Sequence, residues 1–235
     1  MLNDIWVYDL NTGTKTRVSS RGVNQFPTWS PDGKRVAFSS SLGSVNPTLY
    51  WGDLETGAPP ERLSRNGGVQ FPGSWTPDGS TLGYAQTAPG PPDAGTRWDI
   101  WLLRRGSAPS DGPLIQTQFN ENQPMFSPRG RALAYVSDET GQRQVYVRPF
   151  PESGRRIAIS VDGGNEPVWS PRGDELFYRN GDQYFAVPIV ESDLNRPHRP
   201  TFLFKGDFVA SGDIPGVPSY GVAADGQRLL MVQRV

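Results

Sequence analysis

A short turn of the form Ser/Thr-Pro-x-Gly recurs along the chain and constrains the fold more than any other feature. The copies are Ser30-Pro31-Asp32-Gly33, Thr76-Pro77-Asp78-Gly79, Ser127-Pro128-Arg129-Gly130 and Ser170-Pro171-Arg172-Gly173, with a divergent fifth at Ala223-Ala224-Asp225-Gly226. Proline presets φ near the value that a turn needs, and glycine takes a positive φ without a Cβ clash. The turn glycines recur 43 to 53 residues apart. A strand–turn–strand unit at this period predicts the blades of a β-propeller.

Strand patterns flank every complete turn in the same order. The strand before the turn ends in an aromatic residue, which is Trp29, Trp75, Phe126 or Trp169. A second strand follows the turn, and a third strand alternates aromatic and aliphatic residues, as in Asp99-Ile100-Trp101-Leu102. A weaker fourth strand completes a four-stranded meander. Because the aromatic residues recur once per unit at one offset, we expect them in the core between blades.

The two ends of the chain carry complementary halves of this unit. Residues 4–18 match a third and fourth strand, and residues 220–232 match a first and second strand. The sequence therefore predicts an all-β, five-bladed propeller of four-stranded antiparallel blades, closed by pairing of the N-terminal and C-terminal strands. The expected blades are 25–65, 71–118, 122–160 and 165–205, with a composite blade from 219–235 and 1–19. In the alternative, the chain is a fragment of a six-bladed propeller, which could close as five blades or stay open and form oligomers.

Composition narrows the classes of partner. The 235 residues carry a net charge of −1, no cysteine and a single histidine. An even charge balance argues against a nucleic-acid partner, because phosphate binding needs a clustered basic surface. We expect no membrane span, since no apolar run approaches the necessary length. The N-terminus shows no signal-peptide pattern, and a mature or excised fragment remains open.

The side chains give little support for catalysis or metal binding. The motifs of serine hydrolases and kinases are absent, and His198 stands in the loop-like segment Arg196–Pro200. Zinc is disfavoured without cysteine, and Asp138-Glu139 lacks the spacing of a calcium loop. We therefore expect no enzyme, no cofactor and no metal. A glycosidase-like enzyme is the alternative, with Glu121 and Glu166 as the carboxylates nearest the expected channel.

The strongest functional prediction is positional. In a propeller, the connection from the fourth strand of one blade to the first strand of the next reaches the mouth of the central channel. Four such connections place an amide two residues before a proline, at Gln25, Gln70, Asn122 and Asn165. A ring of amides offers donors and acceptors for a peptide backbone. The alternative is that these amides cap strand ends and hold channel water.

Two further residues join the predicted binding site at the mouth. Glu166 follows Asn165 directly, and Trp98 follows a Pro/Gly-rich insertion at residues 87–97. Insertions on a propeller often decorate a binding face. The expected site is therefore Gln25, Gln70, Asn122, Asn165, Glu166 and Trp98.

The repeated motif also resembles a known family. Pro27-Thr28-Trp29-Ser30-Pro31-Asp32-Gly33 and its counterpart at 167–173 resemble the TolB-like, PD40 class of WD40-like propellers. The segments Val145–Pro151 and Glu175–Arg179 look most like the propellers appended to bacterial serine/threonine kinases. The resemblance covers essentially the whole chain and implies the propeller fold.

Members of this class have several roles, so the resemblance implies a range of functions. They bind a partner protein at the channel mouth, gate peptidases, or form the C-terminal part of kinases. We expect a non-catalytic binding or scaffold propeller that engages a peptide or protein partner at the mouth. The alternative is an accessory or sensory part of a multidomain kinase or peptidase. The resemblance further implies a bacterial periplasmic or extracytoplasmic location.

Overall fold

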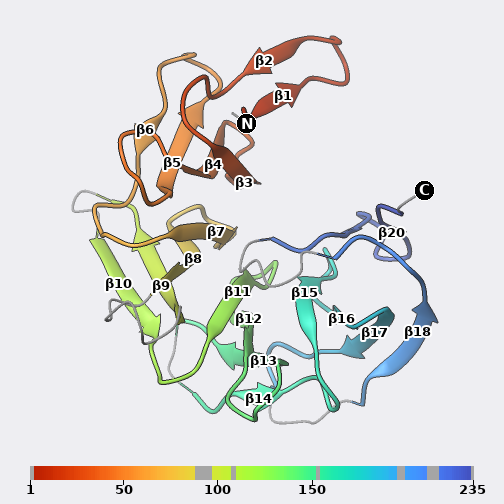
Figure 1. Ribbon diagram of the computed structural model, residues 1–235. Helices are drawn as coiled ribbons and strands as arrows, with labels where there is room; N and C mark the ends of the chain where they lie inside the picture. The colour runs from red at the N-terminus through yellow and green to blue at the C-terminus, as the bar shows by residue number, and fades with distance from the viewer. Residues whose placement is uncertain are drawn as a thin grey trace.

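The computed structural model describes residues 3–87, 97–106, 110–151, 154–194, 199–210 and 217–233. These residues form an all-β propeller of four-stranded antiparallel sheets, arranged one after another around a common centre (Figure 1). Within each sheet the strands follow chain order, and the first strand is an edge strand that faces the centre. No helix long and apolar enough to cross a membrane occurs in the described part of the chain.

Four sheets are complete. The first contains β3 (Asn24–Trp29), β4 (Arg35–Ser40), β5 (Thr48–Asp53) and β6 (Glu61–Arg62), and the second contains β7 (Gln70–Trp75), β8 (Thr81–Thr87), β9 (Trp98–Arg104) and β10 (Ser110–Ile115). The third contains β11 (Glu121–Phe126), β12 (Ala132–Ser137), β13 (Gln144–Pro149) and β14 (Ile157–Ala158). The fourth contains β15 (Asn165–Trp169), β16 (Glu175–Asn180), β17 (Gln183–Pro188) and β18 (Thr201–Lys205).

The recurring turn joins the first and second strands of each complete sheet and the two strands of the C-terminal hairpin. At each copy the glycine N–H donates to the backbone oxygen three residues earlier, at 2.8–2.9 Å, and the glycine φ lies between +68° and +73°. The turn has extra side-chain support where Ser and Asp are present, because the Ser30 hydroxyl donates to Asp32 Oδ1 at 2.5 Å. Local chemistry alone therefore specifies these hairpins.

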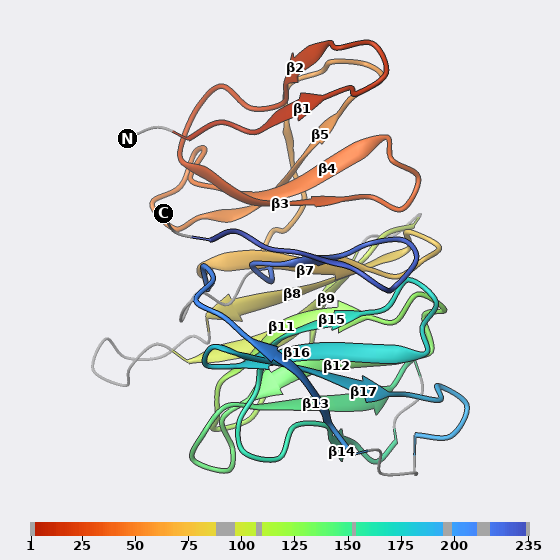
Figure 2. The ribbon, with the colours of Figure 1, turned by 90° about the vertical axis from the view of Figure 1, so that its right-hand side faces the viewer.

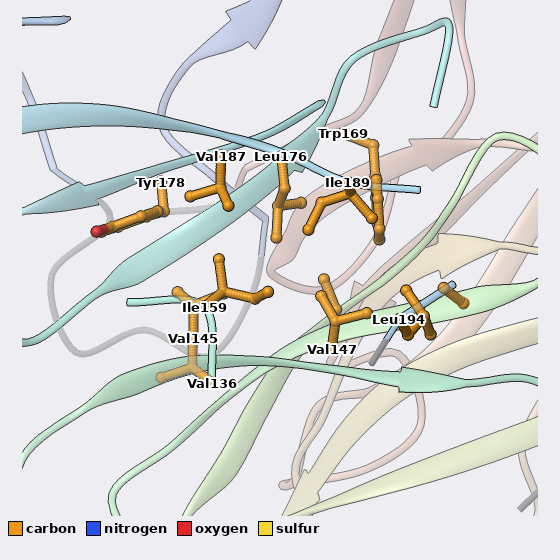
Figure 3. Close-up of a cluster of buried hydrophobic side chains, with 12 residues drawn as sticks. Val136, Val145, Val147, Ile159, Trp169, Leu176, Tyr178, Val187, Ile189 and Leu194 are labelled. Carbon is orange, nitrogen blue, oxygen red and sulfur yellow. The ribbon is translucent and has the colours of Figure 1, made fainter. Parts of the chain in front are cut away.

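Apolar side chains between neighbouring sheets form the core. Figure 3 shows the interface of the third and fourth sheets, where Val147 of the third sheet lies opposite Leu176 and Trp169 of the fourth. Trp75, Phe126 and Trp169 are 7%, 5% and 5% exposed, so these three aromatic residues lie in interblade cores as expected. Trp29 is the exception, because it is 52% exposed. Among the described residues, the N-terminal segment packs on β4 and β5 through Ile5 and Val18 and leaves Trp29 uncovered.

The chain ends in two separate hairpins. The N-terminal hairpin pairs β1 (Trp6–Tyr8) with β2 (Lys15–Arg17), and the C-terminal hairpin pairs β19 (Gly221–Val222) with β20 (Leu229–Leu230). Figures 1 and 2 place the first of these beyond the β3–β6 sheet, at one end of the arc of sheets. The second lies across the opening of the arc, next to the β15–β18 sheet (Figure 1).

The predicted pairing between these termini is not observed in the described residues, where each hairpin is a two-stranded sheet of its own. The physical reason is that each hairpin is fastened to its own neighbour. Asn24 N–H donates to Asn3 O at 3.1 Å at one end, and Ser219 N–H donates to Glu166 Oε2 at 2.8 Å at the other. The ring is therefore open in this structure, and the count of five closed blades stays a prediction, as does the six-bladed alternative.

Candidate functional site: the channel mouth

The first strand of each sheet carries a bulge where it reaches the mouth of the channel. Phe26, Gln123 and Glu166 have φ values of +56°, +53° and +55°, and each directly precedes a proline. The strand register shifts at the same places. Non-glycine residues rarely adopt this left-handed conformation, and a bulge of this kind re-aims side chains next to binding sites. The backbone thus singles out the predicted mouth in three of the four complete sheets.

The second sheet differs from the others in register. Gln70 pairs with Gln86 across the hairpin, as Asn24 pairs with Ser40. Pro72 stands three residues before Trp75, whereas Pro27 stands two before Trp29. Alignment on the proline therefore shifts the second unit by one residue. Counting back from the buried aromatic residue would have placed Gln70 correctly.

Gln70 is a correction to the predicted site, because it is fully buried. Its Oε1 accepts from Leu49 N–H at 3.1 Å, and its Nε2 donates to Ser64 Oγ at 2.8 Å and Gln86 Oε1 at 2.6 Å. These bonds join the second sheet to the first. Gln70 is therefore a clamp between blades and is inaccessible to a ligand.

The remaining amides have unequal access to solvent. Gln25 is exposed and Asn165 is half-buried, whereas Asn122 is buried. Only two of the four predicted amides therefore present a side chain that a partner could reach. Residues 88–96 of the insertion that motivated Trp98 lie outside the described residues, and so does His198.

Three aromatic rings meet at the mouth of the first two sheets. The ring centroids of Phe26 and Phe71 lie 4.8 Å apart in an edge-to-face arrangement, and those of Phe71 and Trp98 lie 5.3 Å apart and stacked. All three side chains are half-buried, so part of each ring remains accessible. We call Phe26, Phe71 and Trp98 the aromatic cluster. The sequence predicted Trp98 alone; the signal for the other two is the repeated Gln-Phe-Pro at 25–27 and 70–72.

The opposite side of the mouth is polar. Gln123 Oε1 accepts from Glu166 N–H at 2.8 Å, and Glu166 Oε2 accepts from both the backbone N–H and the hydroxyl of Ser219, at 2.8 and 2.5 Å. Tyr220 donates its hydroxyl to Glu166 O at 2.8 Å. Burial raises the pKa of Tyr220, and the Glu166 charge raises it further, so the hydroxyl keeps its proton and remains a donor. Glu166, 2% exposed, holds the C-terminal hairpin.

The two carboxylates considered for glycosidase chemistry are both buried in contacts between elements. Glu121 Oε1 accepts from the Thr117 hydroxyl at 2.5 Å, while Glu166 bonds Ser219. Burial raises the pKa of Glu121, the Thr117 bond opposes that shift, and the Asp99 charge adds to it. Each glutamate thus has a partner set of its own and is 2% exposed.

The Asp138-Glu139 segment is also engaged by protein groups. Asp138 accepts from Asn120 N–H at 2.8 Å and from Asn120 Nδ2 at 2.6 Å, and Glu139 pairs with Arg156. Among the described residues, no group of three or more His, Cys, Asp or Glu side chains could hold a metal ion.

Comparisons with known proteins agree with this fold. No model of a protein family matches the chain. The uncharacterized protein Atu1656 of Agrobacterium fabrum is 29% identical over 157 residues, which is 65% of this chain and 50% of that protein. The Tol-Pal system protein TolB of Francisella tularensis is 23% identical over 196 residues, covering 80% of this chain and 43% of TolB. The crystal structure of TolB from Acinetobacter baumannii superimposes with a TM-score of 0.69 at 19% identity, over 97% of this chain and 59% of that one.

The chain thus has a TolB-like β-propeller fold and spans half or less of the length of these curated relatives. The finer resemblance to PD40 and kinase-appended propellers stays a prediction.

Proposed function

We propose that this propeller is a non-catalytic binding module that engages a peptide or protein partner at the mouth of its channel. The observation that carries the proposal is the aromatic cluster, in which three half-buried rings from two neighbouring sheets contact one another. Aromatic rings supply large contact area at low entropic cost and are enriched where proteins bind partners. An accessible apolar cluster beside a polar rim fits the side chains of a peptide.

The amides next to the cluster suit a peptide backbone. Gln25 directly precedes Phe26 and is exposed, so its side chain is free to both donate and accept. A peptide backbone presents one donor and one acceptor per residue, which is the complement of an amide side chain. Gln25 and the aromatic cluster would therefore bind backbone and side chains of the same segment.

Two observations favour binding over catalysis at this mouth. The buried state of Glu121 and Glu166 leaves the glycosidase alternative without a pair of accessible carboxylates. The likeness to TolB of the Tol-Pal system extends over most of this chain, and TolB-like propellers include protein-binding members. The accessory role in a kinase or peptidase, and the extracytoplasmic location, stay predictions from resemblance.

The test is selection of peptides from a random phage-displayed library on the immobilised chain, followed by measurement of the selected peptides by fluorescence polarisation. Phe71→Ala and Trp98→Ala should weaken binding by about tenfold or more, as expected for aromatic residues in a binding hot spot. Lys34→Ala, in a turn at the opposite ends of the strands, is the matched control and should leave binding unchanged. Failure to enrich any peptide, or equal binding by Phe71→Ala and wild type, would refute the proposal.

A further inference from the structure

Because the blades repeat, equivalent residues can be compared at every interface between them. The residue that follows the third strand uses its N–H to bond the residue after the turn glycine, at 2.8–3.0 Å in all four sheets. These equivalent residues are Leu54, Arg105, Phe150 and Ile189. Each shares an interface with a third-strand residue of the preceding unit: Trp51 is in ring contact with Arg105, and Val7, Leu102 and Val147 belong to the same apolar clusters as Leu54, Phe150 and Ile189.

Three of these four facing pairs are wholly apolar. Val147 and Ile189 occupy the two sides of the core drawn in Figure 3, and both are buried. Leu102 and Phe150 belong to the equivalent cluster one interface earlier. At the interface of the first and second sheets, the pair is instead Trp51 and Arg105. At this one interface, both residues of the pair thus differ from the aliphatic and phenyl side chains found at the other three interfaces.

Arg105 is a half-buried cation without a counter-ion. Its guanidinium carbon lies 4.3 Å from the ring centroid of Trp51 and 5.8 Å from that of Trp75. Within the described residues it forms no ion pair and no side-chain hydrogen bond. Burial lowers the pKa of Arg105 and repulsion from Arg35 lowers it further, while the charge of Asp32 opposes these shifts. Arg35 also lies over Trp51, at 4.5 Å, but it is paired with Asp53 at 3.0 Å.

This broken interface opens a cavity of about 820 Å³. Its lining residues are Trp51, Glu61, Arg62, Leu63, Arg65, Asn66, Leu103, Arg105, Gly106 and Asp111. The lining carries three arginines and two carboxylates, and the wall itself engages both carboxylates. Asp111 accepts from Ser64 Oγ at 2.8 Å and Asn66 Nδ2 at 3.2 Å, and Glu61 accepts from Trp51 Nε1 at 3.3 Å.

The next groove along the arc differs from this one in volume and in the pairing of an arginine that lines it. It lies between the second and third sheets, and its volume is about 340 Å³. Its Arg156 is paired with Glu139 and also lies over the Tyr146 ring. Arg156 is thus paired in that groove, whereas Arg105 is not paired in the first. Arg148 also lines the smaller groove, and its Nε is buried without a hydrogen-bond partner among the described residues.

We propose that the groove between the first and second sheets, here called the Arg105 groove, binds a small ligand that carries a carboxylate or a phosphate. Arg105 is the anion-binding residue, because its planar fork matches both groups and no carboxylate of the described residues is paired with it. The groove has the size of a small-molecule site and apolar walls at Leu63 and Leu103 for the rest of the ligand. It is separate from the channel mouth, so its ligand is additional to the peptide partner proposed above.

The experiment measures binding of inorganic phosphate, glucuronate and glucose by isothermal titration calorimetry. Glucuronate and glucose differ only in the carboxylate, so preference for glucuronate isolates the anion. Phosphate binding without glucuronate binding would assign the site to phosphate groups, and the reverse would assign it to carboxylates. In Arg105→Leu, the affinity for whichever anion binds should fall by at least about tenfold.

Arg105→Leu installs the residue type that Leu54 shows to fit the same backbone position, so this variant should fold. Arg105→Lys keeps the charge without the fork and should bind with intermediate affinity. The matched control is Arg104→Leu, which removes the same charge from the exposed neighbouring position. Absence of binding of both anions by wild type at about 10 mM, equal binding of glucose and glucuronate without phosphate binding, or undiminished binding by Arg105→Leu would overturn the proposal.

Discussion

Trp169 and Trp29 occupy the same position of the repeat, but Trp169 is buried and Trp29 is half-exposed. Trp169 ends β15 and packs into the core of the third and fourth sheets, where its indole N–H donates to Met125 O at 2.9 Å. Trp29 ends β3 in the same way and is half-exposed at the open end of the arc. The strand, the turn and the residue type are alike at both places. The difference arises from whether another sheet lies against the face.

This comparison separates two sources of stability in a repeat fold. Local turn chemistry builds each hairpin, whereas burial depends on the nearest neighbour along the array. At the two ends of the arc, the hairpins therefore keep the geometry of a blade but lack the stabilisation that comes from burial against a neighbouring sheet. At the C-terminal end, Leu230 is 78% exposed, although it belongs to a hairpin with the same turn as the others.

The largest expected effect comes from removing the same side chain at both places. Trp169→Ala should lower the free energy of unfolding by about 3–5 kcal/mol, because it leaves a cavity and removes the hydrogen bond to Met125 O. Trp29→Ala should cost about 0.5 kcal/mol or less, as is usual for exposed positions. Chemical denaturation of both variants, with wild type alongside, measures the difference.

An equal loss in the two variants would contradict the open arc. It would mean that the face of β3 is covered in solution, as the closed ring predicted from the sequence requires. Light scattering on the same samples distinguishes closure within one chain from association of several chains.

A smaller effect is expected where the C-terminal hairpin is fastened to the fourth sheet. Glu166→Ala removes the two bonds to Ser219, which should cost about 2 kcal/mol because the acceptor is charged and buried. The loss should act locally, so amide hydrogen exchange at Gly221 and Val222 should accelerate by about thirtyfold. Glu175→Ala, in β16 of the same sheet, is the control and should leave the hairpin protected. Unchanged exchange in Glu166→Ala would show that other contacts hold the hairpin.

The features that could be predicted from the sequence are those that local chemistry determines. Ser30 to Gly33 and its copies specify their hairpins through contacts within a few residues, so the blades could be predicted from the repeat. The placement of the termini depends on which sheet each hairpin contacts, and no pattern within residues 4–18 or 220–232 encodes that choice. For this reason, the structure does not show the predicted pairing of those segments among the described residues.

The candidate site shows the same division. Gln25 was predicted at the mouth from its repeat offset, and Trp98 from the insertion that precedes it. Gln70 was misplaced because a proline, rather than the buried aromatic residue, was used to align the second unit. Arg105 was overlooked, although its signal is present in the sequence: it is the single charged residue among four otherwise apolar equivalents.

The smallest expected change in stability comes from Glu121, an ionisable side chain at the position where the second sheet has the neutral Gln70. Glu121 pairs with Ser137 as Gln70 pairs with Gln86, so the two side chains hold equivalent positions in neighbouring sheets. Gln70 satisfies its amide with three bonds, whereas Glu121 Oε2 has no partner. Glu121→Gln should therefore stabilise the chain by about 1 kcal/mol at neutral pH, because it replaces a buried charge with a neutral acceptor.

The sign of the pH dependence follows from the raised pKa of Glu121. The folded state binds this proton more tightly than the unfolded state, so wild-type stability falls as the pH rises from the unfolded pKa through the folded pKa. The advantage of Glu121→Gln should thus be full at neutral pH and vanish below the ordinary pKa of a glutamate. Denaturation curves of both proteins at several pH values measure this gap, with Glu175→Gln as the exposed-side control. A gap that is constant with pH would show that the pKa of Glu121 is the same in the folded and unfolded states, and would contradict this prediction.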